Sequence, residues 1–145
     1  MNRSQNAGEL FLSGYNCAQS VLLSFADDLK FSKELALKMA AGFGGGMGKQ
    51  QETCGAVTGA IMVLGLLKGE EVNNNDELKA AAYGSVKELS RDFIAAYKTT
   101  QCRELIGCDL NTPEGSEKFK EEKIMENVCA PCVRKAVEIV ENLTT

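Results

Sequence analysis

The sequence lacks histidine and tryptophan and contains only two prolines in 145 residues. Without histidine the chain cannot form a Ser–His or Cys–His pair, which excludes the common hydrolase arrangements. A metal site here would also have to do without imidazole ligands. The most distinctive chemistry left to the chain is that of its six cysteines.

An excess of positive charge is also missing. The chain has 16 Lys and Arg against 20 Asp and Glu, which gives a net charge of −4. It therefore lacks the basic field that attracts nucleic acid or an anionic membrane, and we expect neither as a partner. A redox partner of unknown identity and assembly into a homo-oligomer stay open.

The first residues carry no apolar leader: residues 1–9 contain no hydrophobic stretch of the kind that a secretory signal needs. We therefore expect a cytoplasmic protein in a reducing compartment, where stable disulfides are rare. In such a compartment six cysteines belong to a metal site, a redox couple or the core more often than to a disulfide framework.

Strand signals are almost absent, whereas helical periodicity and helix caps recur along the chain. Asn16, Ser32 and Asp76 each precede a helical pattern and are predicted N-caps. The predicted helices cover residues 4–12, 17–25, 32–40, 54–67, 76–97, 113–125 and the segment after residue 129. The length suits one domain, so we predict a single all-α domain over residues 1–145, a bundle of six or seven helices.

Glycines mark two places where segments are expected to approach closely. Gly55 and Gly59 lie four residues apart on the uncharged helix 54–67 and leave a smooth stripe for another helix. Residues 42–48 contain five glycines, whose backbone N–H groups could form an anion-binding nest around Gly44, Gly45 and Gly46, with Lys49 beside it. We favour a connector instead, because neither a preceding strand nor a Gly-Lys-Ser/Thr ending accompanies these glycines.

Three cysteine positions are predicted to lie where a helix begins: Cys17, Cys54 and the pair Cys129 and Cys132. The free N–H groups and positive end of the helix dipole favour a thiolate at such a position. Cys129 and Cys132 are spaced so that both sulfurs fall on one helix face, within reach of a disulfide or a shared metal. We also expect Cys17 and Cys54 to be neighbours in the bundle.

The order of these motifs resembles a known family. Gly14-Tyr15-Asn16-Cys17-Ala18-Gln19, the glycines of residues 42–48, Cys54-Gly55-Ala56-Val57-Thr58-Gly59, Cys102 and a late cysteine span nearly the whole chain. This arrangement is similar to the bacterial and archaeal family of redox-active proteins named for its C_GCAxxG_C_C pattern. In this chain the box reads Cys-Gly-Ala, with the first two residues in the opposite order to the family name. The resemblance implies a cysteine-based redox or metal-associated role.

Three interpretations of the cysteines remain. In the first, Cys17, Cys54, Cys102 and Cys132 bind an iron-sulfur cluster or zinc, for which four thiolates suffice. In the second, two cysteines form a reversible dithiol couple in which a helix-terminal thiolate attacks and another cysteine, such as Cys102 or Cys108, resolves. The redox candidates are then Cys17, Cys54, Cys102, Cys108, Cys129 and Cys132. In the third, the protein is a helical binding or assembly module whose cysteines only fill the core.

Overall fold

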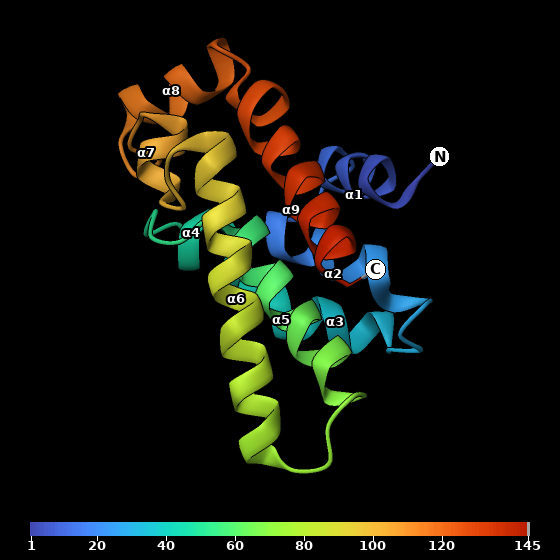
Figure 1. Ribbon diagram of the computed structural model, residues 1–145. Coiled ribbons are helices and arrows are strands. Elements are labelled where there is room, and N and C mark those ends of the chain that lie inside the picture. The colour runs from blue at the N-terminus through green and yellow to red at the C-terminus, as the bar shows by residue number, and fades with distance from the viewer. Residues whose placement is uncertain (145) are drawn as a thin grey trace.

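The computed structural model describes residues 1–144, whose regular structure is helical apart from one antiparallel bridge between Thr53 and Gln101. The predicted all-α fold is confirmed, and seven of the described helices have eight or more residues (Figure 1). The α-helices are α1 (Arg3–Leu12), α2 (Cys17–Ala26), α3 (Lys33–Ala40), α4 (Gly44–Met47), α5 (Gly55–Gly69), α6 (Asn75–Tyr97), α7 (Cys102–Ile106), α8 (Pro113–Glu121) and α9 (Ala130–Leu143). A 3₁₀ turn, η1 (Ala41–Phe43), precedes α4, and a π-helical turn, η2 (Met125–Cys129), precedes α9.

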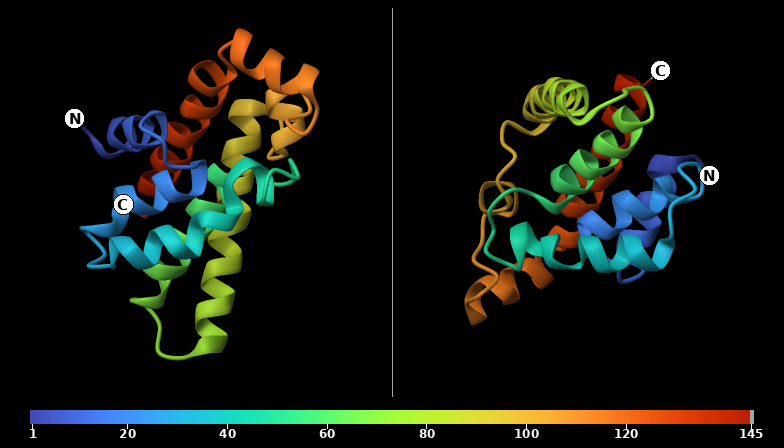
Figure 2. Two further views of the ribbon diagram at one scale, coloured as in Figure 1. Left: turned by 180° about the vertical axis from the view of Figure 1, so that it is seen from behind. Right: turned by 90° about the horizontal axis from the view of Figure 1, so that it is seen from below.

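Helix α5 is the centre of the bundle, because α2, α6 and α9 all pack against it (Figures 1 and 2). Its side chains are uncharged until Lys68, so most of its first ten residues can be buried without a desolvation cost. Val57, Val63 and Leu64 are almost completely inaccessible to solvent. Burial of this helix orients the residues at its N-terminal end, where Cys54 is the N-cap.

The glycine stripe of α5 packs directly against the backbone of α2. A Cβ atom placed on Gly59 would lie 2.9 Å from the carbonyl oxygen of Ala18, and one on Gly55 would lie 3.0 Å from the Cβ atom of Cys17. Real Cβ atoms rarely come this close to other atoms, so the contact requires glycine at both positions. The expected close approach of two helices is therefore confirmed, and α2 is the partner helix.

Side-chain caps explain most of the helix starts. Asn16 caps α2 by accepting the N–H of Gln19, whose side chain in turn accepts the N–H of Asn16, and Ser32 caps α3. The prediction of Asp76 as the N-cap of α6 is wrong. Asn74 is the cap, and Asp76 lies in the first turn, where a carboxylate is favoured by the helix dipole.

The two ends of the described chain lie on the same side of the molecule (Figure 2). Arg3 of α1 holds them together: its Nη1 atom is 2.7 Å from a carboxylate oxygen of Glu141 on α9, and its Nε donates to the carbonyl of Ser24. The same guanidinium forms an ion pair with Asp28 and lies 4.4 Å above the centre of the Phe25 ring. These contacts close α1, α2 and α9 into one layer.

A second, smaller cluster of apolar residues lies beside the main core. Cys102, Ile106 and Ile124 are its buried members, and Leu105 and Phe119 pack against them. The cluster joins α7, α8 and η2, which form the end of the molecule seen at the upper left in Figure 1. We call these three elements the cap. The space between the cap and the main core is the site described below.

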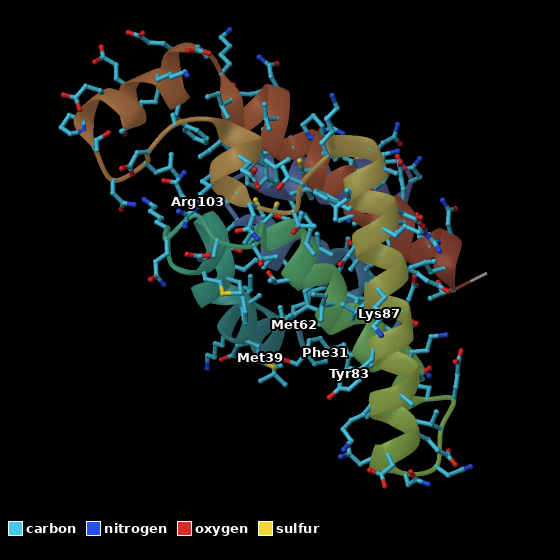
Figure 3. All side chains as sticks on the ribbon, turned by 60° about the vertical axis from the view of Figure 1, so that its left-hand side comes forward. Phe31, Met39, Met62, Tyr83, Lys87 and Arg103 are labelled. Carbon is cyan, nitrogen blue, oxygen red and sulfur yellow. The ribbon has the colours of Figure 1, made fainter. Side chains whose placement is uncertain are left out.

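An apolar groove opens on another face, between α3, α5 and α6. Phe31, Met39, Met62 and Tyr83 line it, and their side chains lie along one side of the molecule (Figure 3). Met39 and Tyr83 are exposed. Within residues 1–144 no helix is both long enough and apolar enough to cross a membrane.

The glycine contact between α2 and α5 can be tested with two alanine substitutions in the same helix. Gly59→Ala should destabilise the protein by about 1–3 kcal/mol, because the new methyl group would overlap the backbone of α2. Gly65→Ala, which meets no atom within 4 Å, should instead stabilise by about 0.5–1 kcal/mol through helix propensity. Urea unfolding measures both changes, and equal effects would contradict the close contact.

Candidate functional site

Five of the six cysteines line one cavity of about 390 Å³ between the cap and the main core. They come from separate elements of the fold. Cys17 is the first residue of α2, Cys54 is the N-cap of α5, and Cys102 is the first residue of α7, while Cys129 ends η2 and Cys132 lies in α9. Sulfur atoms can be followed in Figure 3 close to the start of α5. Residues that are up to 115 positions apart in sequence therefore share one site.

The pairing of α2 with α5 brings the first two cysteines together. Because Gly55 has no side chain, the Cβ atom of Cys17 lies within 3.0 Å of the place that a Cβ on Gly55 would occupy. Cys17 therefore lies against the start of α5, next to Cys54, and the two sulfurs interact electrostatically. The predicted proximity of Cys17 and Cys54 is confirmed.

A short backbone pairing positions Cys102 beside Cys54. The N–H of Cys54 donates to the carbonyl of Thr100 at 2.8 Å, and the N–H of Cys102 donates to the carbonyl of Glu52 at 2.7 Å. Thr53 and Gln101 form the antiparallel bridge between these two bonds. Sequence reasoning missed this pairing, because two residues on each side are too few to show a strand pattern.

The glycine-rich segment, which includes α4, is a left-handed turn rather than a regular α-helix. Residues 45–49 all have positive φ angles, between 63° and 71°. Glycine adopts this conformation without steric cost, whereas Met47 and Lys49 are strained in it. Gly46 also needs to be glycine for space, since a Cβ atom there would lie 2.8 Å from the Cβ of Cys102.

The left-handed turn therefore acts as the close connector that the sequence favoured. A Cβ atom on Gly44 would lie 2.7 Å from the side-chain nitrogen of Asn16, so the turn also packs against this N-cap residue of α2. Gly45, Gly46 and Lys49 line the cysteine cavity. The anion-binding role of this segment stays a prediction.

Arg103 fixes the segment that links this turn to α5 (Figure 3). Its guanidinium donates to the carbonyl oxygens of Gln50 and Gln51 at 3.3 and 3.1 Å, and it lies 2.8 Å from a carboxylate oxygen of Glu52. The backbone N–H of Arg103 also donates to the carbonyl of Gln51. These four contacts leave the residues before Cys54 little conformational freedom. The thiol of Cys54 is thus attached to a fixed backbone.

The prediction that Cys129 lies at the start of a helix is wrong. A continuous helical run begins at Ile124, so Cys129 lies inside a helix rather than at a free helix start. The N–H of Ala130 bonds to the carbonyl of Met125, five residues earlier, as in a π-helix. Pro131 accounts for the wider turn, because it has no N–H and its ring crowds the carbonyl of the preceding turn.

Cys54 is the one cysteine of the cavity whose pKa is lowered. The main cause is a hydrogen bond from the thiol of Cys132, which stabilises the Cys54 thiolate. The amide groups of Ala56 and Val57 at the start of α5 also lower this pKa, although the sulfur makes no capping hydrogen bond of standard geometry. Burial acts in the opposite direction.

The other four thiols of the cavity hold their protons. Burial raises the pKa of Cys17 well above its ordinary value, and it raises that of Cys102 to about 11 and that of Cys129 to about 12. The hydrogen bond to Cys54 is the first cause of the raised pKa of Cys132. In each case the charge of nearby Cys54 adds to the shift. The expected thiolates at Cys17 and Cys129 are therefore corrected: among the five thiols of the cavity, Cys54 is the one whose surroundings favour the thiolate.

Cys108 does not line this cavity, although it packs against the apolar cluster that contains Cys102 and adds to the raised pKa of Cys102 and Cys129. It lines a separate, polar pocket with Arg103 and Asp109, next to the cap. All six cysteines are free thiols. Among residues 1–144, no group of three or more Cys, His, Asp or Glu side chains has an arrangement that could hold a metal ion. The metal site of Cys17, Cys54, Cys102 and Cys132 stays a prediction.

The hydrogen bond from Cys132 should control the reactivity of Cys54. In the wild-type protein we expect Cys54 to be alkylated at neutral pH faster than Cys102 and Cys129. Cys132→Ala removes the donor and should raise the pKa of Cys54, whereas Cys132→Ser keeps an O–H donor and should raise it less. Site-resolved alkylation rates across a pH series measure both shifts. Faster alkylation of Cys129 than of Cys54 would refute this assignment.

Comparison with known proteins shows the family of the chain. Residues 15–143 match the family described as "Putative redox-active protein (C_GCAxxG_C_C)". No curated protein and no solved structure gave a match. The matched region contains all six cysteines and both glycine segments. The chain therefore belongs to the C_GCAxxG_C_C family of redox-active proteins.

Proposed function

We propose that the protein is a thiol–disulfide redox protein in which Cys54 and Cys132 form a reversible two-electron couple. The observation that carries the proposal is that Cys54 and Cys132 line the same cavity, where each has the largest influence on the pKa of the other. Two thiols that interact this closely can close a disulfide, in which the S–S distance is about 2.05 Å. The lowered pKa of Cys54 supports its role as the attacking thiolate.

The proposed exchange begins with Cys54 as the thiolate and Cys132 as the protonated thiol. The Cys54 thiolate attacks one sulfur of a substrate disulfide R–S–S–R, forms a mixed disulfide and expels R–S⁻. The departing thiolate takes the proton of Cys132. The Cys132 thiolate then attacks the sulfur of Cys54, closes the Cys54–Cys132 disulfide and expels the second R–S⁻. One substrate disulfide gains two electrons and the two cysteines lose them. A dithiol reductant restores the starting state by the reverse exchange.

The roles of the remaining cavity cysteines follow from their protonation. Cys17, Cys102 and Cys129 stay neutral near the Cys54 thiolate. The negative charge of that thiolate helps to raise the pKa of each of them, which disfavours a second anion. They surround the couple with polarisable thiols that do not compete for the first attack. Cys108, in its own pocket, has no part in the proposed exchange.

Disulfide mapping tests the couple. Protein purified without oxygen should lose two thiols when it is treated with an excess of a small disulfide, and peptide mapping should find Cys54 joined to Cys132. Cys132→Ser should stop at the mixed disulfide on Cys54, and Cys54→Ser should form neither product. Cys108→Ser is the matched control and should behave as the wild type.

Other results would contradict the proposal in distinct ways. A disulfide between Cys54 and Cys102 or Cys17 would mean that the couple is assigned wrongly. Stoichiometric zinc, or iron with labile sulfide, in the purified protein would favour thiolate ligands of a metal instead. Thiols that resist oxidation in a metal-free, folded protein would favour an assembly module with structural cysteines.

A further inference from the structure

The cysteine cavity has the size and lining of a small-molecule site. Its volume of about 390 Å³ lies in the range of pockets that bind small ligands. Apart from the sulfurs, most of its wall is apolar and comes from both sides: Phe11 from the main core, and Leu105, Ile106, Phe119 and Val128 from the cap. A ligand with an apolar part would therefore be held between the two clusters.

The burial of the couple limits the kind of molecule that can reach it. Cys54 is 7% exposed and Cys132 only 1%. A folded protein would have to displace the cap to bring a disulfide of its own to these sulfurs. A small molecule inside the cavity reaches Cys54 without any such displacement, because Cys54 lines the cavity wall.

The basic and acidic side chains that line the cavity are all lysines. Lys49 and Lys120 line it, and no Asp or Glu among residues 1–144 does. Neither ammonium group takes part in an ion pair or a side-chain hydrogen bond within the described part of the chain. This local positive charge contrasts with the net charge of −4. An acidic group on a ligand would meet two unpaired ammonium groups in the lining, whereas the carboxylate of Glu126 acts on Cys129 from outside the lining.

The backbone holds Lys49 in place despite its strained conformation. Its φ angle is 63°, its N–H donates to Gly44 at 3.1 Å, and its carbonyl accepts from the side chain of Asn111 at 2.9 Å. A left-handed conformation at a non-glycine residue is retained where the surroundings fix it, and such residues cluster at functional sites. Here the strained turn keeps a lysine beside the cavity that contains the couple.

We propose that the substrate of the Cys54–Cys132 couple is a small organic disulfide with an acidic group, whose apolar part fills the cavity and whose acid pairs with Lys49 and Lys120. This inference rests on the proposed function, because the substrate is the disulfide R–S–S–R that accepts the two electrons. The acid remains unchanged in the reaction. It fixes the orientation of the disulfide so that one sulfur faces Cys54.

Three aliphatic disulfides of similar size and different charge test the inference. They are 3,3′-dithiodipropionate, an anion, 2-hydroxyethyl disulfide, which is neutral, and cystamine, a cation. The measurement is the second-order rate of Cys54–Cys132 disulfide formation, followed by acid quench and mass spectrometry. Each rate is divided by the rate of the same compound with the urea-unfolded protein, which removes differences in intrinsic reactivity.

The normalised rate should be highest for the anion and lowest for the cation. The double variant Lys49→Gln/Lys120→Gln should lower the normalised rate of the anion about fivefold, the effect of two solvent-exposed ion pairs, and leave that of the neutral compound nearly unchanged. Lys87→Gln/Lys98→Gln is the matched control. It changes the net charge equally at positions that do not line the cavity, and it should retain the preference.

The outcomes separate this inference from the proposed function. Equal normalised rates for the three compounds, with the Cys54–Cys132 disulfide formed in each case, would overturn the substrate inference and leave the couple intact. An equal loss in the two double variants would also overturn it, because the effect would then come from net charge alone. Failure of all three compounds to produce the disulfide would overturn the proposed function itself.

Discussion

The contact between α2 and α5 depends on the absence of side chains at Gly55 and Gly59. Any larger residue would push the backbone of α2 away and separate Cys17 from the start of α5. A similar constraint recurs at Gly46, where the left-handed turn touches Cys102. Glycine thus allows three segments of backbone to meet around one cavity. The cysteines of the site lie together because the chain can approach itself there more closely than side chains normally permit.

Once the sulfurs share a cavity, electrostatics allows one of them to ionise easily. Each further thiolate would have to form in a buried place beside an existing negative charge, and both effects raise its pKa. Cys54 is favoured because it lies at the start of a buried helix and accepts a hydrogen bond from Cys132. Cys132 cannot use a helix start in the same way, since η2 runs directly into α9. The site therefore pairs one thiol whose ionisation is favoured with one adjacent proton donor, which is what an exchange between two sulfurs requires.

Local signals in the sequence predicted the helices and part of the site. The N-cap at Asn16, the uncharged run of α5 and the glycine-containing turns before Cys17 and Cys54 all act within a few residues, and they led to the helix starts and to the closeness of Cys17 and Cys54. The features that were missed depend on distant or unusual backbone contacts. The bridge beside Cys54 joins segments that are about fifty residues apart in sequence, and the π-turn before Pro131 replaces the free helix start that was predicted at Cys129. Asn74 replaced Asp76 as a cap because consecutive polar residues all suit that position, and the side chain of Asn74 is the one that accepts the N–H of Glu77.

A redox titration tests the central claim most directly. The reduced protein is equilibrated without oxygen in thiol–disulfide buffers of stepped potential, and the free thiols at each step are alkylated and counted by site. If Cys54 and Cys132 are one couple, both thiols should disappear together in a single two-electron transition, with a tenfold change in the ratio of oxidised to reduced protein for about every 30 mV. Independent loss of the two thiols, or oxidation of other cysteines while Cys54 and Cys132 stay reduced, would contradict the account.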